Sequence, residues 1–183
     1  MPDLEVLENP KTNLASEVIS SDGKTLGKYY FNDNRTPVTF EELPNHLVDA
    51  LIATEDIRFY SHSGIDFKRT VAAALKLGKD GGGSTITQQL AKLLFTGEGS
   101  RDIIERLTQK FKEYIIAVRL ERHYTKDEII TQYLNLYDFG NNGDGIRSAA
   151  RIYFGKEPID LDINESAILV GMLKNSSLYN PRP

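Results

Sequence analysis

The order of apolar and polar residues divides the chain into a short strand-forming part and a long helical part. Within residues 15–38, apolar and aromatic residues flank the turn sequence Ser21-Asp22-Gly23, which predicts a β hairpin. Further along, apolar residues recur every three or four positions, as on one face of a helix. We therefore expect a β appendage over residues 1–40 and one mainly α domain over residues 41–183.

The apolar spacing predicts several helices, and polar residues mark where two of them begin. The helical segments lie over 47–52, 67–77, 84–95, 102–122, from 125 onward, 146–153 and 163–173. Thr85 and Gln88 form a T-x-x-Q capping box, and the hydroxyl of Thr125 can cap the helix that follows it. The longest helix has its main apolar stripe at Ile103, Ile104, Leu107, Phe111, Tyr114, Ile115 and Val118.

Composition excludes several classes of function. The net charge of −4 argues against a nucleic-acid partner, which would require a basic surface. The absence of cysteine excludes disulfides, thiolate metal sites and a cysteine nucleophile. The three histidines do not occur at metal-ligand spacing, and no nucleotide-binding fingerprint is present, so we expect no structural metal and no organic cofactor.

The chain offers two interpretations of its relation to a membrane. No apolar run reaches the roughly 18 residues that span a bilayer, and the first residues lack signal-peptide features, so we expect a soluble or peripheral chain. In the 67–79 stretch, small apolar residues are bracketed by Lys68, Arg69, Lys76 and Lys79. This pattern suits a helix lying at a lipid headgroup surface. It suits an ordinary amphipathic helix on the core equally well.

Glu55 is the first candidate for acid–base chemistry. It falls at the C-terminal end of a predicted apolar helix, where the helix dipole disfavours a carboxylate. A carboxylate whose anion is destabilised is a better proton acceptor. Asp56, Arg58 and His62 follow closely, so titratable groups are dense here. The alternative interpretation is a solvated helix end with salt bridges.

Glu113 is the second candidate. It lies roughly 140° around the long helix from the main apolar stripe, yet Ile116 and Leu120 beside it are also apolar. The helix is therefore expected to be buried, and a carboxylate inside it requires a partner or a function. Pairing with Lys110 or Lys112 at the surface is the alternative.

A glycine-rich loop at residues 80–83 leads into the helix that begins near Ser84. Free backbone N–H groups at a helix start suit an anion such as a phosphate. The hydroxyls and carboxamides of residues 84–89 suit sugars or phosphates, and Lys92 lies one turn further along. A flexible connection to a capped helix is the alternative interpretation.

Five short motifs occur in order between Glu55 and Gly171. They are E-D-x-x-F-x-x-H-x-G-x-D from Glu55 to Asp66, G-x-S-T-I-T-Q-Q-L-x-K from Gly82 to Lys92, Gln109-Lys110 with Glu113, Ala117, Leu120 and Glu121, K-x-x-I-x-x-x-Y-L-N from Lys126 to Asn135, and Tyr153-Phe154-Gly155-Lys156 with Glu165 and Gly171. With these motifs the chain resembles the peptidoglycan glycosyltransferases, which are the polymerising domains of class A penicillin-binding proteins and the monofunctional transglycosylases. Five ordered matches are far more specific than one short pattern.

The resemblance implies a lysozyme-like, mainly α fold with a small membrane-facing subdomain. It also implies an inverting enzyme that polymerises lipid II into β-1,4-linked glycan strands and releases undecaprenyl pyrophosphate. The implied partners are lipid II, the growing glycan chain and inhibitors of the moenomycin type. The implied location is the outer, extracytoplasmic face of the bacterial cytoplasmic membrane, with the anchor lying outside this chain.

The resemblance also assigns residue roles. Glu55 would be the general base, and Glu113 would assist at the pyrophosphate, directly or through Mg²⁺ or Mn²⁺. Arg58, Lys92 and Lys110 would hold the departing phosphates. The other residues that are expected to bind substrate are Asp56, His62, Ser84, Thr85, Gln88, Gln89 and Asn135.

Two positions depart from the family pattern, and two rival functions stay open. Gln109 stands where the family usually has Arg, and Arg147 stands where relatives often have Glu. One rival is a glycan-cleaving enzyme of the lytic transglycosylase type on the same fold. The other is a non-catalytic glycan-binding module, against which the presence of both Glu55 and Glu113 speaks.

Overall fold

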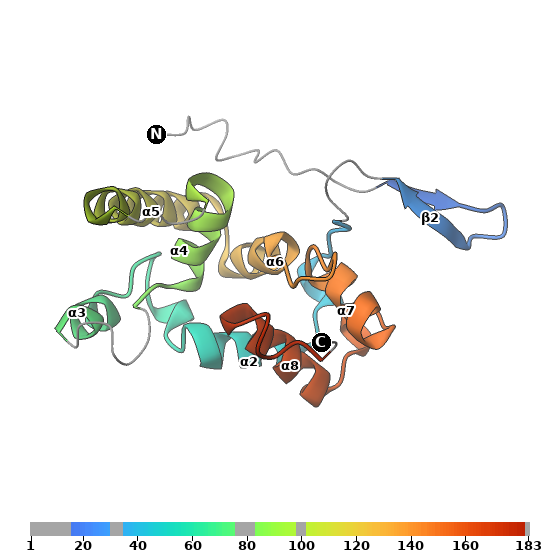
Figure 1. Ribbon diagram of the computed structural model, residues 1–183. Helices are drawn as coiled ribbons and strands as arrows, with labels where there is room; N and C mark the ends of the chain where they lie inside the picture. The colour runs from blue at the N-terminus through green and yellow to red at the C-terminus, as the bar shows by residue number, and fades with distance from the viewer. Residues whose placement is uncertain (1–15, 30–34, 76–82, 98–101, 182–183) are drawn as a thin grey trace. The chain divides into compact units, whose positions relative to one another are not determined.

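The computed structural model describes residues 16–29, 35–75, 83–97 and 102–181, and these residues are mainly helical (Figure 1). They form two compact units. The first unit runs from Leu51 to Tyr133, and the second contains the described residues before and after it. The mainly α fold is confirmed. The predicted domain boundary at residue 40 and the membrane-facing subdomain stay predictions.

The predicted hairpin is present in the second unit. Strands β1 (Ser16–Ile19) and β2 (Thr25–Tyr29) pair in antiparallel fashion, with one irregularity of register after Val18. Gly23 has a φ of +80°, and its amide donates to the carbonyl of Ser20 at 2.9 Å. The left-handed conformation of this glycine closes the turn, as the Ser-Asp-Gly sequence predicts.

The second unit contains parts of two α-helices and two complete ones. They are the first part of α2 (Asn45–Glu55), the end of α6 (Lys126–Leu136), α7 (Ile146–Phe154) and α8 (Ile163–Lys174). Asp162 caps α8 through a reciprocal capping box with Glu165.

Arg147 donates to the carbonyl of Pro37 at 2.8 Å and forms ion pairs with Glu42 and Glu157. This departure from the family pattern therefore has a structural role within the second unit.

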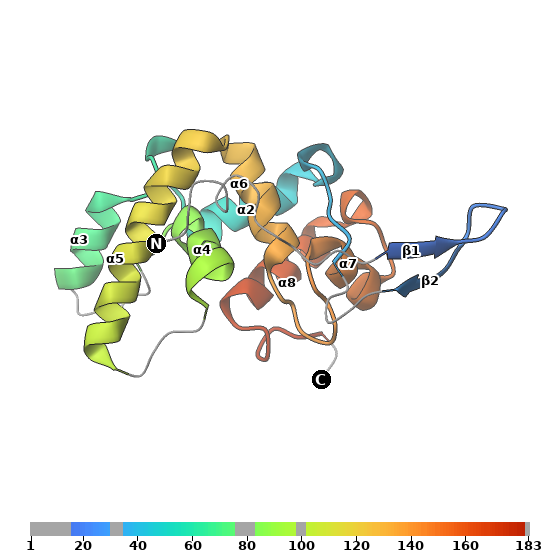
Figure 2. The ribbon, with the colours of Figure 1, turned by 90° about the horizontal axis from the view of Figure 1, so that it is seen from above.

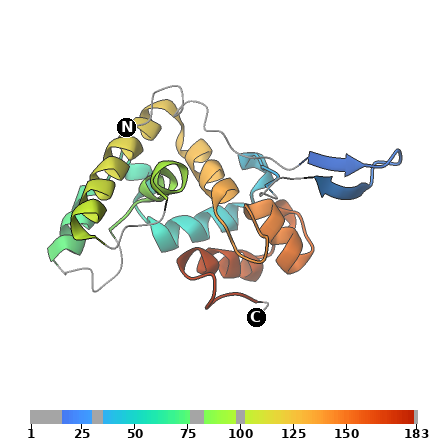
Figure 3. The same ribbon diagram turned by 45° about the horizontal axis from the view of Figure 1, so that its top comes forward.

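The first unit is built around the packing of α4 against α5, which lie side by side in Figures 2 and 3. Its elements are the end of α2, η2 (Phe59–Ser61), α3 (Phe67–Leu75), α4 (Ile86–Ala91), the π-helix η3 (Lys92–Thr96), α5 (Ile103–His123) and most of α6. Its buried side chains include Leu51, Phe59, Ile86, Leu90, Ala91, Ile116, Ala117, Leu120, Ile129, Ile130 and Tyr133.

The helix that was predicted over residues 84–95 differs from expectation at both ends. The α-helix ends at Ala91 and continues as a π-turn, because the amide of Gly97 bonds to the carbonyl of Lys92 at 3.0 Å. At the start, Thr85 accepts a hydrogen bond from the Gln88 amide, as predicted. A capping box also requires a return bond from the Thr85 amide to the Gln88 side chain. This second bond was predicted wrongly, because the Gln88 carboxamide donates to the carbonyl of Gly64 instead. The predicted helix end at 76–77, the glycines 81–82 and the lysines at 76 and 79 lie outside the described residues.

The long helix turns a different face to the core than its main apolar stripe suggested. Ile104 and Phe111 are 75% and 65% exposed, and Leu107 and Ile115 are exposed as well. The opposite face, with Glu113, is buried, because α4 packs there. The expectation that α5 is buried on both sides is therefore wrong.

Gly64 allows the loop after η2 to approach α5 closely. It has a φ of +89°, and a Cβ atom at this position would lie 2.8 Å from the backbone carbonyl of Ala117. Only glycine combines this conformation with this approach.

We expect Gly64→Ala to lower the free energy of unfolding by about 3 kcal/mol, because the clash is with backbone atoms that cannot move aside. Gly155→Ala is the matched control. Its φ of +68° is also left-handed, but a Cβ there would meet nothing within 4 Å, so its cost should be about 1 kcal/mol. Urea unfolding measures both. Equal costs would contradict the close-approach explanation.

Candidate active site

Asp56 fastens the loop after α2 to the start of α4. Its carboxylate is almost fully buried and accepts hydrogen bonds from the amide of Ile86 at 3.1 Å and from Nε2 of His62 at 3.0 Å. The predicted anion site at this helix start is therefore wrong in one respect: the Ile86 amide already binds a carboxylate of the protein. Asp56 and His62 contact protein atoms here, which indicates that they position the loop.

Thr85 and Gln88 tie the second motif to the first. The Thr85 hydroxyl and the Gln88 carboxamide both donate to the carbonyl of Gly64, at 2.7 and 3.2 Å. Both side chains are buried. Their polar groups thus act within the protein, and contact with a substrate stays a prediction for both.

Glu55 lies at the end of α2, as expected, and its side chain is half-buried. Nε2 of Gln89 donates to Oε2 of Glu55 at 2.8 Å, and the hydroxyl of Tyr133 donates to Oε1 of Gln89 at 2.9 Å. A guanidinium nitrogen of Arg69 donates to the main-chain carbonyl of Glu55. Arg69 is one of the basic residues that the sequence left open between a lipid surface and an ordinary amphipathic helix, and here its guanidinium contacts the protein main chain.

Glu113 lies on the buried face of α5 and is 4% exposed. Nζ of Lys110 contacts Oε2 of Glu113 at 2.6 Å and the hydroxyl of Ser84 at 2.7 Å. Burial and, secondarily, the charge of Glu113 raise the pKa of the Tyr114 hydroxyl. The predicted residues Ser84, Lys110 and Glu113 therefore form one hydrogen-bonded cluster.

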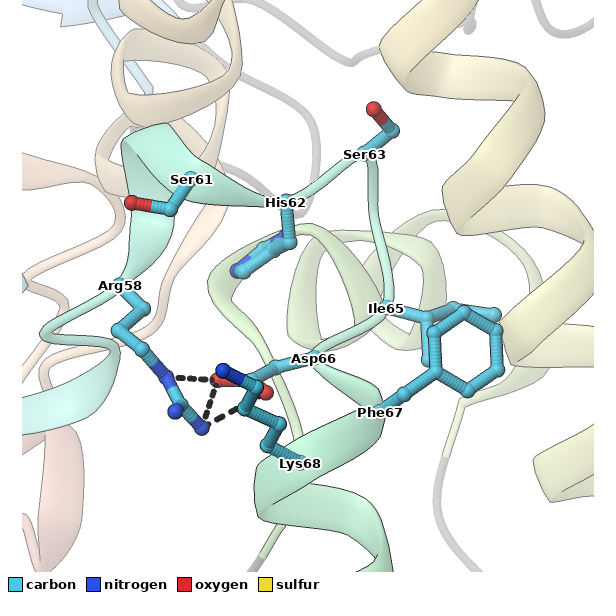
Figure 4. A pocket seen from close by; sticks show the side chains of 8 residues that line it. All are labelled: Arg58, Ser61, His62, Ser63, Ile65, Asp66, Phe67 and Lys68. Carbon is cyan, nitrogen blue, oxygen red and sulfur yellow. Dashed lines mark hydrogen bonds and ion pairs between the residues drawn. The ribbon is translucent and has the colours of Figure 1, made fainter.

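A pocket of about 450 Å³ lies beside the first motif (Figure 4). It is lined by Arg58, Ser61, His62, Ser63, Ile65, Asp66, Phe67 and Lys68. Arg58 donates two hydrogen bonds to Asp66, both at 2.8 Å (Figure 4). Burial raises the pKa of Asp66, but the amide of Arg69 and the guanidinium of Arg58 lower it by more, so this pKa lies below its ordinary value of 3.8.

Two charged residues that sequence reasoning did not assign to the site hold its parts together. Nζ of Lys126 contacts Glu121 and the carbonyl of His62, each at 2.7 Å, and lies 4.2 Å from the centre of the Phe59 ring. Glu121 also accepts from the hydroxyl of Thr87 at 2.6 Å. Glu121 belongs to the third motif and Lys126 to the fourth. Membership of these motifs was the only indication in the sequence that the two residues belong to the site.

Two further predicted residues are Lys92 and Asn135. Lys92 is exposed in η3. Asn135 belongs to the second unit, where its carboxamide exchanges hydrogen bonds with the main chain of Val38, both at 2.9 Å. This pairing fixes the segment before η1 (Phe40–Glu42). Substrate binding by Lys92 and Asn135 stays a prediction.

The donors around Glu113 do not resemble a metal site built by the protein. Across the described ranges, no group of three or more His, Asp and Glu side chains lies close enough to hold a metal ion. The Lys110 ammonium also sits against Glu113. A divalent cation at Glu113 stays a prediction.

The structure therefore holds two carboxylates on different helices, Glu55 of α2 and Glu113 of α5, each with its own hydrogen-bonding partner. Residues 22–183 match the transglycosylase family, and the chain belongs to this family.

The chain is similar to several penicillin-binding proteins. It is 39% identical to penicillin-binding protein 1A of Pseudomonas aeruginosa and 38% identical to that of Escherichia coli, in each case over 99% of the chain. It is 42% identical to penicillin-binding protein 1F of Bacillus subtilis over 91% of the chain. The chain spans only 22%, 21% and 23% of these relatives.

Asp66 generates a pH-dependent prediction. Because its folded-state pKa is depressed, its contribution to stability is fully present above about pH 4 and disappears as the pH falls through the folded-state value. We expect Asp66→Asn to lower the free energy of unfolding at neutral pH by roughly 1 kcal/mol, through the weakened Arg58 pair. The difference should close in strong acid. Asp49→Asn, at an exposed position of α2, is the control and should leave the free energy of unfolding at neutral pH nearly unchanged. A gap that persists in strong acid would contradict the assignment.

Proposed function

We propose that this domain is a peptidoglycan glycosyltransferase that polymerises lipid II into β-1,4-linked glycan strands. The observation that carries the proposal is Glu55, a half-buried carboxylate at a helix end that an amide donor holds in place. Family membership and the second acidic cluster at Glu113 support it.

In the proposed reaction, Glu55 accepts the proton of the attacking 4-hydroxyl. Gln89 engages Oε2, so we assign Oε1 to that proton. The hydroxyl oxygen bonds to the anomeric carbon of the growing chain with inversion, and the bond from that carbon to the lipid pyrophosphate breaks.

The leaving pyrophosphate carries the developing negative charge. We assign its stabilisation to Lys110, which is only partly buried, together with the Ser84 hydroxyl. Glu113 holds the Lys110 ammonium in position from the protein side. Arg58 and Lys92 would bind phosphate further out, and a moenomycin-type inhibitor would compete for the same groups.

Glu55→Gln should lower the rate of polymerisation by about a hundredfold or more, because a carboxamide cannot accept the proton. The melting temperature should change little, since the glutamine still fits the end of α2. Glu105→Gln, an exposed acid of α5, is the control that removes the same charge and should stay active. Lipid II polymerisation is the measurement.

Two outcomes of this assay favour the rivals. Shortening of purified glycan strands without growth from lipid II would favour the lytic enzyme. Binding of glycan without either reaction would favour a non-catalytic module.

We also propose that the first unit rests on a membrane surface, at the outer face of the cytoplasmic membrane. The described helices include none that is both long and apolar enough to cross a bilayer. Apolar side chains are nevertheless exposed on α3, at Phe67 and Val71, and on α5, at Leu107 and Phe111. Exposed apolar faces of this kind suit insertion at the headgroup boundary.

Leu107→Ser/Phe111→Ser should weaken binding to liposomes by roughly tenfold, because two large apolar side chains are lost from the face. Ile163→Ser, at a 66% exposed position of the second unit, should leave binding unchanged. Co-sedimentation measures both. Equal binding by the α5 variant and the wild type would refute the membrane-facing assignment.

A further inference from the structure

A partly buried series of hydrogen bonds runs from Tyr133 through Gln89 to Glu55. The Tyr133 ring is fully buried, its hydroxyl donates to Gln89, and Gln89 donates to the Glu55 carboxylate. Tyr133 comes from α6, Gln89 from α4 and Glu55 from α2. Three helices therefore meet through this one series of hydrogen bonds.

These hydrogen bonds offset the unfavourable position of the Glu55 carboxylate at the end of α2. Glu55 stands at the carbonyl end of α2, where the helix dipole disfavours negative charge. A hydrogen bond that is donated to a carboxylate favours its charged form. The Gln89 amide supplies such a bond, and the nearby Arg69 guanidinium adds positive charge at the main chain of Glu55.

Gln89 can supply this bond only in one orientation. Its carboxamide has two ends of similar size, and only the NH₂ end can donate to Glu55. If the amide turned over, it would direct its carbonyl oxygen at the carboxylate. The Tyr133 hydroxyl requires an acceptor because it is buried, and by donating to Oε1 it fixes Nε2 toward Glu55.

We propose that Tyr133 is a positioning residue for Glu55: it orients the Gln89 amide, which keeps the Glu55 carboxylate charged and in place between turnovers. Tyr133 itself contacts no substrate. After Glu55 takes up a proton, its own preference for the NH₂ end weakens, and Tyr133 then holds the amide until the proton leaves. The proposal rests on the proposed function of Glu55 as the base and assigns Gln89 to the base rather than to the sugar.

Tyr133→Phe tests the proposal, because it removes one hydroxyl from a buried ring of the same shape. We expect kcat for lipid II polymerisation to fall about tenfold with KM unchanged, and the acid limb of the kcat profile to move up by about one pH unit. Tyr137→Phe is the matched control. It removes a hydroxyl that donates to the carbonyl of Leu173 at 2.9 Å in the second unit, and both quantities should stay as in the wild type.

A double-mutant cycle separates a relay from general loosening of the fold. Gln89→Leu should produce the same shift of the acid limb, and adding Tyr133→Phe to it should produce no further shift, since the two residues act in series. Shifts that add would overturn the proposal. So would a Tyr133→Phe enzyme with altered KM and an unmoved acid limb.

A readout without turnover distinguishes failure of this proposal from failure of the proposed function. The ¹³C carboxyl signal of Glu55, assigned with Glu55→Gln, can be titrated in the wild type and in Tyr133→Phe without lipid II. A midpoint that rises in the variant supports the relay even if Glu55→Gln still polymerises, which would refute only the role of the base. An unchanged titration midpoint of Glu55 in Tyr133→Phe overturns the proposal that Tyr133 positions Glu55 through Gln89.

Discussion

The first unit depends on one buried carboxylate, that of Asp56. It binds the first amide of α4 and the His62 ring, so it joins the loop after α2 to the helix that carries the second motif. A buried charge is tolerated only when it is paired and hydrogen-bonded, and the positive end of α4 provides both. Glu55 immediately precedes Asp56, so the same contact also places Glu55, the proposed base.

The groups around this contact act mainly on one another. Thr85 and Gln88 hold the Gly64 carbonyl, and Lys126 holds the carbonyl of His62 while it pairs with Glu121. Two of the motifs' polar positions, Glu55 and Lys110, stay partly accessible. The motifs therefore contain a framework of buried polar bonds and a smaller set of groups that can meet a substrate, which matches the need of catalysis for preorganised charges.

Sequence reasoning succeeded where structure is local. The hairpin turn, the caps at Thr85 and Thr125 and the extent of α5 all follow from residues a few positions apart, and all are present. It failed for the face of α5, because the stripe with the most apolar residues, including Phe111, is exposed while Glu113 is buried. Helical spacing identifies stripes, but only packing against α4 decides which stripe is covered.

The sequence by itself determined the mainly helical class and the family, and it predicted two candidate acids, Glu55 and Glu113, since all of these depend on spacing and on ordered motifs. The tertiary structure alone decided the partners that are distant in sequence: Gln89 for Glu55, Tyr133 for Gln89, Ser84 for Lys110 and the Ile86 amide for Asp56. Such partners stand up to 44 residues apart along the chain. Hydrogen bonds require directed contact within about 3 Å, and no periodicity of a single chain encodes which distant side chains will meet that condition.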